Sequence, residues 1–108
     1  LHKRRLIIMV KHVILWKLKE ELTAEEKENV KAGIKEGLEG LAGKVPGLVD
    51  VKVNINGLPS STVDVMLDTT FTDADALKAY STNPLHVAVA DGKVRPYTAV
   101  RSCLDYEV

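Results

Sequence analysis

The apolar segment over residues 9–18 constrains the fold more than any other part of this chain. It is rich in β-branched residues, which favours a strand, and the side chains of a strand alternate between two faces. One face would carry Val10, His12, Ile14, Trp16 and Leu18, and the other Met9, Lys11, Val13, Leu15 and Lys17. Both faces are largely apolar, so we expect both to be covered in the folded protein.

A helix is expected after this strand. Thr23 fits the N-cap of a capping box in which Glu26 reaches back to it. The apolar residues that then recur at helical spacing are Val30, Ile34, Leu38, Leu41 and Val45. Gly33 and Gly37 lie beside this stripe, and an interior glycine costs about 1 kcal/mol relative to alanine. The favoured interpretation is that the helix packs very close to the sheet there. The alternative is that the missing side chains leave room for a pocket.

The rest of the chain predicts three further strands and two further helices. Residues 49–55 place apolar side chains at every odd position, which is the clearest period-two pattern in the sequence. Residues 63–71 and 97–106 predict the other two strands. Asp73 can cap a second helix, and the Asn-Pro pair at 83–84 suits the start of a short extra helix.

The resulting order, β-α-β-β-α-β, predicts an α+β, ferredoxin-like fold with a four-stranded antiparallel sheet and helices on one face. A chain of 108 residues fits one such domain. Because helices cover only one face of this sheet, the face with Val13 and Leu15 would be an exposed apolar patch in a monomer. We therefore predict a homodimer that buries this open face and forms a dimeric α/β barrel.

Composition removes several classes of function. Fifteen Lys and Arg residues balance fifteen Asp and Glu residues, so the chain lacks the positive charge of a dedicated nucleic-acid binder. No apolar run approaches the roughly 20 residues that cross a bilayer, so we expect no membrane partner and a cytoplasmic location. The single cysteine, Cys103, excludes an internal disulfide and a cysteine-based zinc cluster, and its apolar context predicts a small core residue.

Four segments together resemble the Dabb family, the stress-responsive A/B barrel domain. They are residues 9–19, the Val-Pro-Gly at 45–47, residues 79–86, and the Leu-Asp-Tyr at 104–106. The third segment is similar to the family pattern Tyr-x-x-His-Pro-x-His. The resemblance covers residues 9–108 as one domain and implies a ferredoxin-like homodimer. Residues 1–8 lie outside it, as a cloning remnant, an upstream start or an extension of the first strand.

The resemblance also implies a site between the helices and the sheet. In a plant polyketide cyclase of this family, a histidine acts as base and a tyrosine steadies the substrate carbonyl. These catalytic roles fall here on His86 and Tyr80. The predicted substrate-binding residues are His12, Ile14, Trp16, Val30, Ile34, Val89 and Tyr97. No metal is expected among the side chains, although some relatives hold magnesium through backbone carbonyls, here around residues 45–49.

This sequence departs from the family pattern at two places in the site. Asn83 replaces the histidine before the proline, and the first helix lacks the cyclase's bulky aromatics, with Gly37 at one apolar position. These changes predict a pocket of different shape. His86 falls in the first turn of the short helix, where the helix dipole lowers the imidazole pKa and favours a neutral base. In the structural alternative, Tyr80 packs on the sheet and bonds its hydroxyl to backbone or to His86, and His12 is a hydrogen-bonded core residue.

Three functional hypotheses remain. The first is a cofactor-free cyclase or lyase that acts on a carbonyl compound with His86 as base. The second is a non-catalytic, stress-related binding protein for a small apolar carbonyl compound, and the third is a structural barrel whose output is assembly. An open cavity that reaches His86 and Tyr80 favours the first two. A cavity filled by Trp16, Leu41 and Met66 favours the third.

Overall fold

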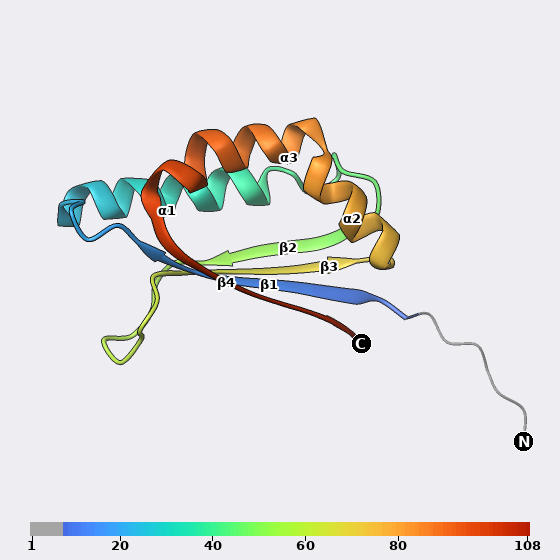
Figure 1. Cartoon of the computed structure of the whole chain (residues 1–108), viewed down its shortest axis with the longest axis horizontal. Coiled ribbons are helices and arrows are strands. Elements are labelled where there is room, and N and C mark those ends of the chain that lie inside the picture. The colour runs from blue at the N-terminus through green and yellow to red at the C-terminus, as the bar shows by residue number, and fades with distance from the viewer. Residues whose placement is uncertain (1–7) are drawn as a thin grey trace, which may run out of the picture.

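The computed structural model describes residues 8–108, so most of the expected extension over 1–8 lies outside the described residues. The elements are β1 (Val10–Leu18), α1 (Ala24–Glu39), β2 (Leu48–Asn54), β3 (Val65–Phe71), α2 (Ala74–Thr82), α3 (Pro84–Val89), η1 (Ala90–Val94), η2 (Arg95–Tyr97) and β4 (Thr98–Glu107). The strands form one antiparallel sheet in the order β2-β3-β1-β4, and the helices lie on one of its faces (Figure 1). The predicted α+β, ferredoxin-like fold is confirmed.

The caps of the three α-helices confirm the sequence pattern. The Thr23 hydroxyl accepts from the backbone N–H of Glu26 at 3.1 Å, and the Glu26 carboxylate accepts from the N–H of Thr23 at 2.8 Å. These are the two bonds of a capping box, and they satisfy donors that the helix leaves free. Asp73 caps α2, and Asn83 with Pro84 starts α3, which continues through the π-helical turn η1 and the 3-10 turn η2.

Gly37 marks a close approach between two helices. A Cβ atom at this position would lie 2.8 Å from a Cγ atom of Val89 in α3. The expectation of close packing was therefore right, but the expected partner was wrong: α1 approaches α3, not the sheet. Gly33, one turn earlier, borders an open groove instead, where an added Cβ would make only an ordinary contact of 3.7 Å with Lys93. Close packing therefore explains Gly37, whereas open space beside the helix explains Gly33.

The second strand differs from its period-two prediction at its first residues. The register of β2 against β3 shifts between Leu48 and Asp50, as in a β-bulge. Leu48 rather than Val49 therefore packs against the core, and Val49 is 50% exposed. Beyond the bulge the alternation holds, with Val51 half-buried and Val53 fully buried.

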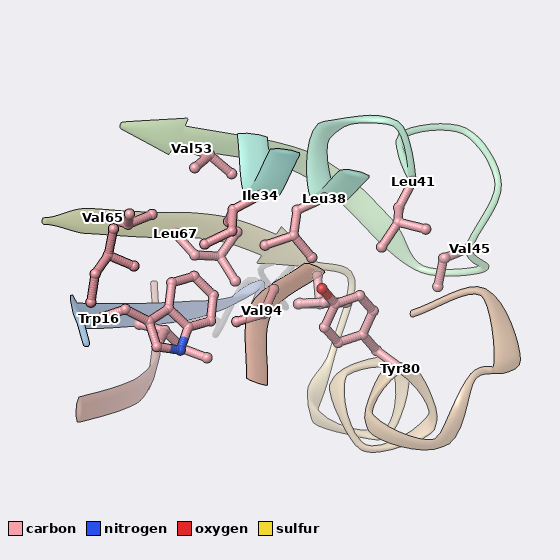
Figure 2. Close-up of a cluster of buried hydrophobic side chains, with 13 residues drawn as sticks. Trp16, Ile34, Leu38, Leu41, Val45, Val53, Val65, Leu67, Tyr80 and Val94 are labelled. Atoms are coloured by element: carbon pink, nitrogen blue, oxygen red, sulfur yellow. The ribbon is translucent and has the colours of Figure 1, made fainter. Parts of the chain in front are cut away.

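The core fills the space between the helices and the sheet. Ile34 and Leu38 point from α1 towards Leu67 on β3, and Tyr80 enters the same cluster from α2 (Figure 2). Burial alternates strictly along β1 and β3, because one face of each strand meets this core. Trp16 and Leu18 are buried on the helix-facing side of β1, as the phase of the strand predicted.

The opposite face of the sheet carries no helix (Figure 1). Val13 and Leu15 are half-buried there, and Leu104, which pairs with Val13 on β4, is 63% exposed. Lys11 and Asp68 form an ion pair of 2.8 Å on the same face. The exposed apolar patch expected for a single copy is therefore present. None of the helices in the described part of the chain has the length and apolar character needed to cross a bilayer.

Cys103 is exposed, so its assignment to the core was wrong. It lies on the helix-facing side of β4, opposite Ile14 of β1. β4 is an edge strand, and the helices do not extend over most of it, so its residues remain accessible on both faces. An apolar strand pattern does not separate a central strand from an edge strand.

Candidate functional site

A cavity of about 170 Å³ lies between the sheet and the helices that follow β3. Its wall includes His12, Ile14 and Trp16 from β1 and Leu38 from α1. Tyr80 and His86 both line it, so the space between helices and sheet is open to the predicted pair. Trp16 lies on the wall rather than filling the space, which favours a ligand-binding cavity over a solid core.

Tyr80 and His86 stack on each other across the break between α2 and α3. Their ring centroids are 3.9 Å apart, with 29° between the planes. The Asn83 side chain sets this geometry, because its Oδ1 accepts from the N–H of Leu85 at 2.9 Å and of His86 at 3.5 Å. Asn83 is therefore the N-cap of α3. Although it replaces the histidine of the family pattern, α3 still begins at the expected position.

The polar atoms of this pair are buried without partners. Among residues 8–108, neither the Tyr80 hydroxyl nor His86 Nδ1 has a hydrogen-bond partner. The structural alternative required Tyr80 to bond to backbone or to His86, and no such bond is present in this part of the chain. Buried polar atoms are normally satisfied, so two unpaired atoms on residues that line one cavity are candidates for hydrogen bonds to a ligand.

Burial sets the protonation of both groups. It raises the pKa of Tyr80 to about 12, so the phenol keeps its proton at neutral pH. It also lowers the pKa of His86; hydrogen bonding to the backbone of Tyr80 and Ser81 raises that pKa, and the positive charge of Arg95 lowers it. The sequence correctly predicted a lowered pKa for His86. The main cause of this shift is desolvation by burial rather than the helix dipole.

His12 points from the sheet towards the helices, as expected, and it has a carboxylate partner. Its Nδ1 lies 2.5 Å from Asp105 Oδ1 on the neighbouring strand β4. An ionised carboxylate only accepts, so Nδ1 carries a proton in this pair, and a neutral ring leaves Nε2 as the basic nitrogen. The sequence reasoning missed Asp105 as a site residue, although the register of β1 against β4 pairs it directly with His12.

One side-chain group in the described residues has the composition of a metal site. His12, Cys103 and Asp105 each offer a ligand atom, and these atoms lie within 4.8 Å of one another. Nitrogen, sulfur and oxygen ligands suit zinc. The His12 and Asp105 side chains already satisfy each other directly, however, and burial together with Asp105 raises the pKa of the Cys103 thiol, which opposes thiolate formation. The expected magnesium position around residues 45–49 stays a prediction.

The predicted site residues divide among four places. His12, Ile14, Trp16, Tyr80 and His86 share the cavity. Val30 and Tyr97 instead line the open groove beside Gly33, a separate hollow of about 390 Å³. Ile34 is fully buried in the core, and Val89 packs against α1 at Gly37.

Two arginines in the wall were also missed. Arg95 comes from η2, and Arg101 from β4, where it pairs with Trp16. The strand phase could have placed Arg101 on the same face as the predicted site. The sequence held no comparable signal for Arg95, because the turn that carries it is irregular.

Comparison with known families gives one match. The model of the stress responsive A/B barrel domain, Dabb, matches residues 10–108. This chain belongs to the Dabb family. The family match covers every element of the fold and the whole cavity wall, so the resemblance seen in the sequence is confirmed. A comparison with curated proteins found no match for this Dabb chain.

Solved structures similar to this Dabb chain include proteins described as dimeric, with a ferredoxin-like fold. A dimeric protein of unknown function with this fold from Bacteroides fragilis is 35% identical, with a TM-score of 0.87 over 93% of this chain and 96% of its own. A Dabb family protein from Mesorhizobium loti is 17% identical, with a TM-score of 0.69 over 92% and 95% of the two chains. A hydroxynitrile lyase from Passiflora edulis is 15% identical, with a TM-score of 0.69 over 93% of each chain.

Proposed function

We propose that this Dabb protein is a cofactor-free lyase or cyclase that acts on a small carbonyl compound, with His86 as the general base and Tyr80 as the donor to the carbonyl oxygen. The observation that carries the proposal is that two residues lining one cavity, Tyr80 and His86, each have a buried polar atom without a partner. A general base needs a free nitrogen, and an oxyanion donor needs a free hydroxyl. This pair supplies both within one stacked arrangement.

The protonation states suit this division of roles. The lowered pKa of His86 leaves the imidazole neutral at pH 7, ready to accept a proton from the carbon beside a carbonyl. The electron pair of that C–H bond forms the C=C bond of the enolate, and the π pair of the carbonyl moves onto its oxygen. The protonated Tyr80 phenol, with its pKa of about 12, donates a hydrogen bond to this oxygen. The enolate then attacks a second carbonyl in a cyclase. A lyase runs the reverse step and breaks the carbon–carbon bond.

His12 is a second titratable group in contact with Tyr80 that can support the same chemistry. The His12 and Tyr80 ring centroids lie 6.2 Å apart, and Asp105 holds the His12 ring through Nδ1. A histidine oriented by a carboxylate is a competent proton carrier. In this scheme His12 receives or returns the second proton of the cycle, while His86 performs the first transfer.

The fold and the cavity size are consistent with this reaction class. A hydroxynitrile lyase shares the fold, so the same architecture holds a lyase site in that protein. The cavity of about 170 Å³ compares with a protein cavity of about 150 Å³ that accepts benzene. A substrate with one ring or a short chain fits these dimensions.

We also propose that the working protein is a homodimer joined through the open sheet face. The structural neighbours described as dimeric support this assembly, and one of them is 35% identical to this chain. Covering Val13, Leu15 and Leu104 with a second copy removes the exposed apolar patch. The catalytic cavity lies on the other face and stays accessible.

Hydrogen–deuterium exchange tests the catalytic proposal without the natural substrate. The protein in D2O is mixed with acetophenone or phenylacetone, and deuterium incorporation beside the carbonyl is followed by NMR. We expect protein-dependent exchange that falls by roughly 10²–10⁴-fold in His86→Gln. Tyr80→Phe keeps the ring and loses one donor, so it should slow exchange by a smaller factor, near 10²-fold. Circular dichroism checks that both variants remain folded.

The alternatives give different results in the same experiment. Binding of the ketone with no exchange by the wild-type protein refutes the catalytic proposal and favours the non-catalytic binding protein. Neither binding nor exchange, together with a dimer in solution, favours a structural barrel. Exchange that His86→Gln leaves unchanged excludes His86 as the base and points to His12.

A further inference from the structure

The wall of the cavity carries positive charge and no acidic side chain. Arg95 and Arg101 both line it, and none of the lining residues is Asp or Glu. The apolar part of the wall includes Ile14, Trp16 and Leu38. The cavity is therefore amphipathic, with an apolar interior for a hydrocarbon group and guanidinium groups for a negative charge.

The two arginines are not equally engaged. Arg95 already forms an ion pair with Asp91, one turn before it. Arg101 forms no ion pair with a carboxylate among residues 8–108, and its side-chain partner there is the Cys103 thiol. A guanidinium presents five donors in a fork that matches a carboxylate, and the contact with a thiol leaves most of them available.

The charges of both arginines act on groups of the site. Arg95 contributes to the lowered pKa of His86, and Arg101 opposes the raised pKa of Cys103. Because His86 lines the cavity, the effect of Arg95 on it shows that positive potential reaches the cavity wall. A neutral ligand would leave this potential uncompensated, whereas an anion would be attracted by it.

We infer that the cavity binds a one-ring carboxylate, with Arg101 holding the carboxylate and Arg95 adding a second positive charge to the cavity wall. This inference deepens the proposed function by naming the substrate class, and it rests on that function only for the reaction, because binding needs no catalysis. The cavity of about 170 Å³ matches a benzoate-sized molecule. Arg101 projects from the helix-facing side of β4, as its pairing with Trp16 shows, so a dimer formed through the opposite face leaves it in place.

Trp16 provides a built-in probe for this binding. It is the only tryptophan in the chain, and it lines the cavity. We would titrate the full chain with sodium benzoate and with benzamide, which has nearly the same shape and no charge, and follow tryptophan fluorescence. At pH 7.5 the lowered pKa of His86 keeps its imidazole neutral, so His86 adds no charge of its own.

We expect benzoate to bind at least about tenfold more tightly than benzamide. A hydrogen bond between charged groups stabilises a complex more than a neutral one does, and the difference corresponds to about a tenfold change in affinity. Arg101→Gln should reduce this preference to within about twofold while leaving benzamide affinity unchanged. Arg95→Gln should lower it by a smaller factor, since Arg95 is shared with Asp91. Lys93→Gln is the matched control, because it removes one positive charge beside the other groove.

Four results would overturn the inference. They are absence of binding by either compound, equal affinity for benzoate and benzamide, an Arg101→Gln effect on both ligands alike, and an equal loss of preference in Lys93→Gln. The ketone-exchange experiment separates this inference from the catalytic proposal: a preference for benzoate that depends on Arg101 supports the carboxylate site even if the wild-type protein exchanges no deuterium into the ketone.

Discussion

Gly37→Ala tests whether the contact between α1 and α3 positions the site. The new Cβ would lie 2.8 Å from Val89 Cγ1, closer than side chains tolerate, so α3 or Val89 must move. Alanine gains about 1 kcal/mol of helix propensity over glycine. Overpacking of a filled contact costs about 1–3 kcal/mol. The net change in the free energy of unfolding is therefore between zero and a loss of about 2 kcal/mol.

Gly33→Ala is the matched control in the same helix. Its Cβ would meet Lys93 at 3.7 Å, an ordinary contact, so only the propensity gain of about 1 kcal/mol remains. The difference between the two variants cancels propensity and isolates the steric cost, which we expect to be about 1–3 kcal/mol. Urea unfolding at one fixed protein concentration measures it, since dimer stability depends on concentration.

The same pair of variants reports on the site. His86 lies one turn before Val89 in α3, so an outward movement of α3 should separate His86 from Tyr80. Gly37→Ala should therefore slow ketone exchange, and Gly33→Ala should not. Adding Val89→Ala to Gly37→Ala removes the clash, so the two changes should couple favourably in a double-mutant cycle. Equal stability of Gly33→Ala and Gly37→Ala would refute the close-approach argument.

Three further predictions concern pH, assembly and metal. The lowered pKa of His86 means that the folded protein binds fewer protons than the unfolded chain, so stability should fall as pH drops below about 6.5 through the folded pKa. In His86→Gln the free energy of unfolding should depend less on pH over this acidic range. The rate of ketone exchange by the wild-type protein should rise with pH over the same range and level off by neutral pH. Val13→Asp should convert the dimer to monomer or unfold it, seen by light scattering, because it places an unpaired charge in the interface; a wild-type monomer at micromolar concentration would contradict the proposed assembly. EDTA should leave ketone exchange unchanged, whereas a loss restored by Zn²⁺ would assign a metal to His12, Cys103 and Asp105.

The fold was predictable because local signals and topology agree. The capping box at Thr23, the cap at Asp73 and the Asn83 start each fix a helix boundary by local hydrogen bonds, which sequence spacing shows directly. The exposed apolar face followed from the two apolar sides of β1. The bulge after Leu48 was not predictable, because a one-residue register shift leaves no mark in an alternating pattern. Similarly, nothing local distinguishes edge strand β4 from a central strand.

The site was only half predictable, and the reason lies in where its residues come from. Tyr80 and His86 sit six positions apart around a recognisable helix break, so sequence spacing alone brings them together. Asp105 comes beside His12, and Arg101 reaches the cavity wall, only through the pairing of β4 with β1. Once the ferredoxin-like topology is assumed, that pairing is implied, and each residue of β1 that faces the helices acquires a partner. The pairing then places the carboxylate of Asp105 beside His12 and the guanidinium of Arg101 beside Trp16. Strand register, rather than motif matching, is the step that turns a family resemblance into specific expectations about charge in the cavity.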